Sequence, residues 1–273
     1  MTQNDNNTRL GRRESLMMLG LATVLVYILW NVAALGFLTY PLRLFVTYVH
    51  EAGHSAAALL TGGDVIGFQV NSDGSGLATT RGGSRAIILP AGYIGAAFFG
   101  AALFYVVNTT RAAKSIAIAI GVGLIVFSLF YAVPSDGLPV ALFIGAGMGW
   151  LLIAVGWKAS SSATLVLLNV LAIMTALNAV LDLIYLTRNT DVGLSTGAGF
   201  VRNDAVAFQQ EVASFLPASV WAFLWAGIAV LMIAVAVYFS VLRPLLRDTG
   251  DAVRGGVGGI SSLDPRPKNR DRN

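Results

Sequence analysis

Long apolar runs are the feature that most restricts the fold of this chain. Seven runs come close to the roughly 20 residues that a helix needs to cross the hydrocarbon core of a membrane. They lie at residues 15–38, 42–62, 86–107, 115–134, 137–157, 163–187 and 219–242. Of the 273 residues, 56% are hydrophobic and only 12% are charged, too few to cover a soluble domain of this size. We therefore expect an all-α polytopic membrane protein with about seven transmembrane helices.

The two ends of the chain are polar. We expect a polar N-terminal tail over residues 1–14, a membrane domain over 15–242 and a disordered C-terminal tail over 243–273. The first run stays apolar as far as Tyr40, which favours a retained anchor over a cleaved signal peptide. Both tails are basic, yet a seven-span count puts them on opposite sides of the membrane, against the usual bias of basic residues toward one side.

Three connections between the runs have recognisable patterns. Residues 64–70 and 75–80 are rich in β-branched residues and flank the turn-like Asn-Ser-Asp-Gly of 71–74, which predicts a short β-hairpin. The Pro-Ser-Asp-Gly of 134–137 indicates a tight turn within a helical hairpin. Residues 205–215 have helical spacing of apolar side chains and predict a helix at the membrane interface.

The charge and the cysteine count exclude several classes of function. The net charge is +4, and many of the basic residues lie in the tails and short connections. In a membrane protein this distribution indicates contact with anionic lipid or residues that set the topology, and it argues against a nucleic-acid partner. The chain has no cysteine, which excludes disulfides, cysteine-bound metals and thiol nucleophiles.

Titratable side chains inside the predicted spans indicate a metal site. The second run contains His50, Glu51 and His54 in an H-E-x-x-H pattern. Residues four apart share one helix face, so both imidazoles can bind one metal ion, and Glu51 lies beside the first ligand in the position of a general base. These two are the only histidines of the chain, and such groups are costly in hydrocarbon unless they have a function. A metal-free polar cluster is the alternative.

A catalytic zinc site usually has three protein ligands. Asp182 in the sixth run is the candidate that we favour as the third, with Asn178 one helical turn earlier on the same face. Asp182 could instead mark a helix end or pair with Arg188. Asp204 and Asp136 are alternative ligands, and Asp204 could equally be the N-cap of the helix that follows it.

These motifs resemble those of the site-2 protease family of intramembrane zinc metalloproteases, in particular its compact branch without a PDZ domain. The resemblance rests on H-E-x-x-H in an apolar helix, the glycine-rich hairpin, Pro90-Ala91-Gly92-Tyr93-Ile94-Gly95 and a distant intramembrane aspartate. It implies one Zn²⁺ per chain bound by His50, His54 and Asp182, with Glu51 as the base and Asn178 orienting the substrate.

The function that this resemblance implies is hydrolysis of peptide bonds in membrane-protein substrates, within or near the bilayer of the cell membrane. The predicted hairpin offers a strand edge to which an unwound substrate segment could add. The alternative is a zinc-binding membrane protein without peptidase activity, such as a transporter or a binder of membrane segments. Other divalent metals could occupy the same ligands.

Overall fold

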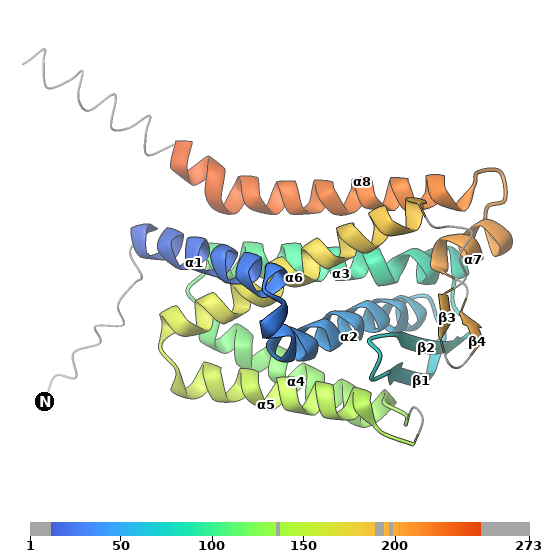
Figure 1. Ribbon diagram of the computed structural model, residues 1–273, viewed down its shortest axis with the longest axis horizontal. Helices are drawn as coiled ribbons and strands as arrows, with labels where there is room; N and C mark the ends of the chain where they lie inside the picture. Colours follow the sequence, from blue (N-terminus) through green and yellow to red (C-terminus); the bar gives the residue numbers. More distant parts are fainter. Residues whose placement is uncertain (1–11, 135–136, 189–193, 197–198, 202, 247–273) are drawn as a thin grey trace, which may run out of the picture.

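The computed structural model describes residues 12–134, 137–188, 194–196, 199–201 and 203–246, so most of both predicted tails lies outside the described residues. Eight α-helices and two small hairpins make up the described fold (Figure 1). The elements are α1 (Arg12–Asn31), η1 (Ala33–Leu35), α2 (Gly36–Leu60), β1 (Asp64–Val70), β2 (Gly76–Arg81), α3 (Arg85–Thr109), α4 (Ala113–Tyr131), α5 (Val140–Lys158), α6 (Ser161–Arg188), β3 (Leu194–Thr196), β4 (Gly199–Val201), α7 (Asp204–Glu211), α8 (Ala218–Val237) and the π-helical η2 (Tyr238–Leu242).

Each predicted apolar run falls on a long helix, and the all-α membrane fold is confirmed. By length and composition, five described helices can cross a membrane: α3, α4, α5, α6 and α8 with its continuation. The α1–α2 pair, bent by 106° at η1, passes the same test as a unit and raises the number to six. Figure 1 shows that α1 begins and η2 ends at the same end of the bundle. With the α1–α2 pair counted as one bent span, the described chain crosses six times, which agrees with both of its ends lying at this end of the bundle.

Small residues allow the helices to approach closely, as is usual where lipid supplies no hydrophobic driving force between them. In the α4–α5 hairpin, which the sequence predicts, a Cβ on Gly121 would lie 2.5 Å from the carbonyl oxygen of Gly149. In the α2–α3 pair, a Cβ on Gly53 would collide with the carbonyl oxygen of Ala91. The second contact lies inside the H-E-x-x-H segment and brings α3 against the two histidines.

The predicted hairpin after α2 is confirmed as the antiparallel pair β1–β2. Gly74 in its turn has a φ of +94°, which glycine adopts without strain. Buried Phe68 anchors β1 against the ring of Tyr48 on α2, with ring centroids 4.7 Å apart. Figure 1 shows this hairpin, the β3–β4 hairpin and α7 gathered at one end of the bundle. The predicted interfacial helix corresponds to α7.

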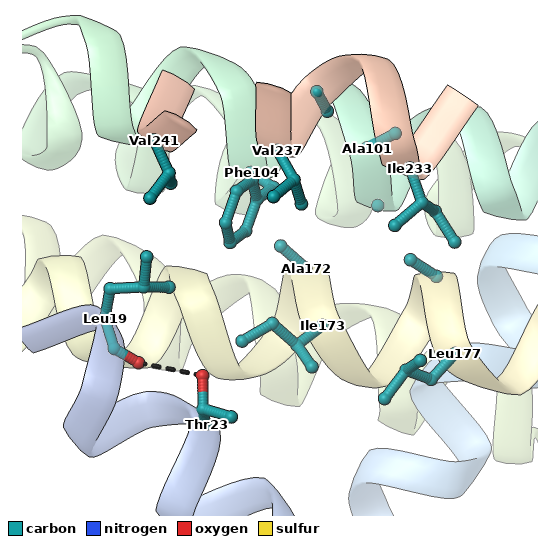
Figure 2. A pocket seen from close by; sticks show the side chains of 13 residues that line it. Leu19, Thr23, Ala101, Phe104, Ala172, Ile173, Leu177, Ile233, Val237 and Val241 are labelled. Atoms are coloured by element: carbon teal, nitrogen blue, oxygen red, sulfur yellow. Dashed lines mark hydrogen bonds between the residues drawn. The ribbon is translucent and has the colours of Figure 1, made fainter. Parts of the chain in front are cut away.

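An apolar cavity of about 280 Å³ lies between α1, α3, α6 and the end of α8 (Figure 2). Phe104, Ile173 and Val237 are among the residues that line it, and Thr23, which is also in the lining, uses its hydroxyl to bond the carbonyl oxygen of Leu19. Its lining includes none of the predicted site residues. The cavity is therefore separate from the metal-binding motif.

Candidate metal centre

The two histidines of α2 face each other across one helical turn. Their Nε2 atoms lie 3.1 Å apart, and the rings meet edge to face with centroids at 4.8 Å. His54 is buried and His50 is half-buried. The spacing of four residues therefore places both imidazoles on one helix face, as predicted, with one nitrogen of each ring beside the same point.

Asp204, the first residue of α7, completes this group. Its Oδ2 atom lies 3.5 Å from Nε2 of His50 and 3.3 Å from Nε2 of His54. Asn203 caps α7, because its Oδ1 accepts a hydrogen bond of 2.8 Å from the backbone N–H of Val206. The cap role that the sequence allows for Asp204 thus belongs to its neighbour, and the carboxylate of Asp204 points to the histidines.

The three atoms fit the chemistry of a metal site. Ligand atoms at about 2.0 to 2.1 Å from a tetrahedral zinc ion lie roughly 3.3 to 3.4 Å from one another. The observed separations of 3.1, 3.3 and 3.5 Å surround that value. Among the residues that the structure describes, His50, His54 and Asp204 form the one set of three titratable side chains that could hold a metal ion.

The environment of Asp204 favours its ionised form. Burial alone would raise the pKa of this carboxyl group, but the charge of His54 and hydrogen bonds to both histidines outweigh burial and hold the pKa well below its usual range. Asp204 therefore presents a carboxylate, the state in which it binds a metal ion.

Helix α3 leaves space for an ion and orients one of the ligands. A Cβ built on Gly92 would collide with the Nε2 atoms of both histidines. Only glycine leaves the space between them open. The carbonyl oxygen of Ile88, one turn earlier, lies 2.7 Å from Nδ1 of His54. When a metal ion takes the place of the proton on Nε2, a hydrogen bond from Nδ1–H to this oxygen keeps Nε2 directed at the metal position.

Glu51 lies beside the group of three and is held by the hairpin. Only 7% of the residue is exposed, and its Oε2 accepts a hydrogen bond of 2.8 Å from the backbone N–H of Ala78 in β2. A Cβ on Gly76 would lie 2.6 Å from Cγ of Glu51, so β2 can pass this close only with glycine there. The carboxylate is thus fixed next to the site without joining the three converging atoms.

Asp182 lies outside this group, and the geometry does not bring it to the position of a third ligand. It is exposed on α6, near enough to His50 and Arg43 for their charges to act on it. Asn178, one turn earlier, is half-buried. Asp136 lies outside the described residues. Helix α7 packs against α3 and α8 and presents Asp204 to the two histidines instead.

The sequence reading missed three features of the site. Gly92 and Tyr93 lie in a motif to which it assigned no role, and the ring of Tyr93 packs against His50 with centroids 4.4 Å apart. Arg43 also lies inside the second predicted span, where the sequence analysis considered only His50, Glu51 and His54. Its signal was present, since it precedes His50 by two helical turns and so shares its face.

A match to a known protein family covers most of the chain. The sequence matches the family described as Peptidase M50B-like over residues 18–236, a segment that includes the motif helix, the hairpin and Asp204. Neither curated proteins nor solved structures give a match.

Proposed function

Because the chain belongs to the Peptidase M50B-like family of metalloproteases, consistent with the site-2 protease resemblance, we propose that it is a zinc metallopeptidase of the cell membrane. It hydrolyses peptide bonds of membrane-protein substrates within or near the bilayer. The observation that carries the proposal is the convergence of His50, His54 and Asp204 on one point, with the buried carboxylate of Glu51 beside them.

His50, His54 and Asp204 would hold one zinc ion per chain, with Asp204 taking the place that the sequence gives to Asp182. The fit rests on the three separations and on Gly92, which leaves the ion's position open. When bound, zinc supplies a Lewis acid that polarises the scissile carbonyl group.

Glu51 is the general base of the proposed reaction. Its Oε2 is held by the N–H of Ala78, which fixes the carboxylate and leaves the other oxygen to accept a proton from the attacking water. The same carboxyl group then delivers that proton to the leaving amine. A site that only stored or transported zinc would have no use for a base in this position.

The substrate segment adds as a strand along the outer edge of β2, on either side of the Ala78 N–H that already holds Glu51. The outer edge of β1 is already covered, because its Phe68 carbonyl accepts a hydrogen bond of 3.0 Å from Val133 N–H and its Gln69 side chain bonds the carbonyl of Pro134. The edge of β2 instead faces Glu51 through the N–H of Ala78. An unwound segment on that edge passes directly beside the base. Asn178, on the neighbouring α6, supplies an amide to orient it.

The test compares the purified wild type with Glu51→Gln for metal content and for cleavage of a model transmembrane substrate. We expect the variant to retain about one zinc per chain and to lose cleavage, since an amide cannot accept the proton. Glu14→Gln, a matched change in α1, serves as the control and keeps both properties. Zinc binding without cleavage in the wild type would instead support the non-peptidase alternative, and loss of zinc in Glu51→Gln would make Glu51 a ligand.

A further inference from the structure

Arg43 is a charged side chain on the helix that carries the metal ligands. It lies in an apolar stretch of α2, where an ionised group is costly and is usually kept for a function. Its position, two turns before His50 and near three turns before His54, places it on the face that holds both ligands. The side chain is exposed, so it lies along an accessible side of this face.

The hairpin runs alongside that same face. At its turn, Nη2 of Arg43 would lie 3.8 Å from a Cβ on Gly74, and the hydroxyl of Thr47 donates a hydrogen bond of 2.7 Å to the Gly74 carbonyl. Further along, the N–H of Ala78 bonds Glu51. The hairpin therefore follows α2 from Arg43, which lies beside its turn, to Glu51, which lies beside β2. A segment that adds along the outer edge of β2 and continues past the turn meets both side chains.

Within the described part of the chain, Arg43 has no hydrogen bond and no ion pair. Two other arginines of the described chain differ: Arg81 pairs with Asp64 at 3.0 Å and Arg85 with Glu211 at 2.8 Å. The charge of Arg43 acts on Asp182, but the two side chains form no salt bridge. The guanidinium group thus offers its donors to an anion from outside the described fold.

The spacing along the helix sets where that anion lies in a substrate. Seven residues of α-helix separate Arg43 from His50, a rise of about 10 Å at 1.5 Å per residue. An extended strand advances about 3.3 Å per residue, so roughly three substrate residues cover the same distance. The anion that reaches Arg43 is then about three residues from the bond that is cut.

We propose that Arg43 selects substrates with an aspartate or glutamate side chain about three residues from the scissile bond. This inference rests on the proposed peptidase function. A guanidinium–carboxylate pair is directional and often bidentate, so it contributes to register as well as affinity. If the substrate adds antiparallel to β2, the acidic residue lies on the C-terminal side of the bond, and a parallel strand puts it on the N-terminal side.

The test is a positional scan of one model transmembrane substrate, with Asp, Asn or Lys placed in turn at each of the five positions on either side of the scissile bond. The wild type, Arg43→Gln, Arg43→Glu and the control Arg111→Glu are compared by kcat/KM. We expect the wild type to prefer Asp over Lys by about tenfold at one position near the third, as one charge-assisted contact would give. Arg43→Gln should remove the preference, Arg43→Glu should reverse it, and Arg111→Glu, in the distant α3–α4 connection, should keep it.

Metal content and substrate binding keep the result interpretable. All variants should retain zinc. If the reversed charge in Arg43→Glu prevents folding, Arg43→Lys is used in its place, and this variant should keep the preference for Asp. The preference can also be measured without turnover, as the Kd of each substrate for the zinc-loaded Glu51→Gln variant. If the wild type does not cleave the substrate, the proposed function is contradicted. If the wild type cleaves but shows no preference at any position, or if its preference survives in Arg43→Gln, only the role of Arg43 is overturned.

Discussion

Oδ2 of Asp204 lies 3.3 Å from Nε2 of His54, although the two residues come from a short helix late in the chain and from the motif helix near its start. This contact sets the first prediction. Asp204→Ala should lower zinc affinity by more than about a hundredfold, since loss of a direct ligand exceeds the 10- to 100-fold typical of residues behind the ligands. Asp182→Ala should keep the zinc. Metal content and competition with a chelator measure both, and the reverse pattern would restore Asp182 as the ligand.

The histidines should each be indispensable for metal binding. We expect close to one zinc per chain in the wild type and almost none in His50→Ala or His54→Ala, because the chain has no other histidine and no cysteine to replace them. Elemental analysis of purified protein gives the stoichiometry. Asn178→Ala, a change beside the site that removes no ligand, is the control and should retain zinc. Full zinc occupancy after either histidine change would rule out this site.

Substitution of Gly92 should abolish zinc binding as completely as substitution of a ligand, although Gly92 itself does not bind the ion. Its replacement by alanine puts a methyl group against both Nε2 atoms, and we expect zinc binding and cleavage to be lost. The control is Gly147→Ala in α5, where a Cβ meets nothing within 4 Å and alanine improves helix propensity. Both variants should remain folded by circular dichroism. Normal zinc content in Gly92→Ala would show that the ion does not lie between the two histidines.

The ion pair between Arg85 and Glu211 should support the metal site from a distance. Arg85 Nε bonds Glu211 Oε2 at 2.8 Å and ties the start of α3 to the end of α7, the helix that presents Asp204. Both side chains are partly exposed, so the pair is worth at most about 1 kcal/mol. Glu211→Arg should therefore weaken zinc binding by about threefold to fivefold, and adding Arg85→Glu should restore it.

Asp64→Arg is the matched control for that charge reversal. It breaks a comparable exposed pair, with Arg81 on the hairpin, and should leave zinc affinity unchanged. Chelator competition compares the four proteins. An unchanged affinity in Glu211→Arg, or a double variant no better than the single one, would mean that α7 is held in place by its packing alone.

The features that the sequence determined depend on short-range geometry. A helix repeats every 3.6 residues, so His50 and His54 face one point wherever the helix lies, and Glu51 follows beside them. The turn of the hairpin is likewise local, because Gly74 takes its positive φ without strain. The apolar runs located the long helices, since only helices satisfy the backbone of such runs in a membrane.

Only the tertiary structure decided what depends on how distant segments meet. The apolar pattern cannot show whether the break at η1 begins another span or bends one, because both leave the same composition. Nor can spacing choose among Asp182, Asp204 and Asp136 as the third ligand. That choice follows from α7 packing against α3 and α8, with Asn203 as the N-cap and Asp204 facing the histidines. Ligands on one helix are fixed by its period, whereas a ligand from another helix is fixed by packing.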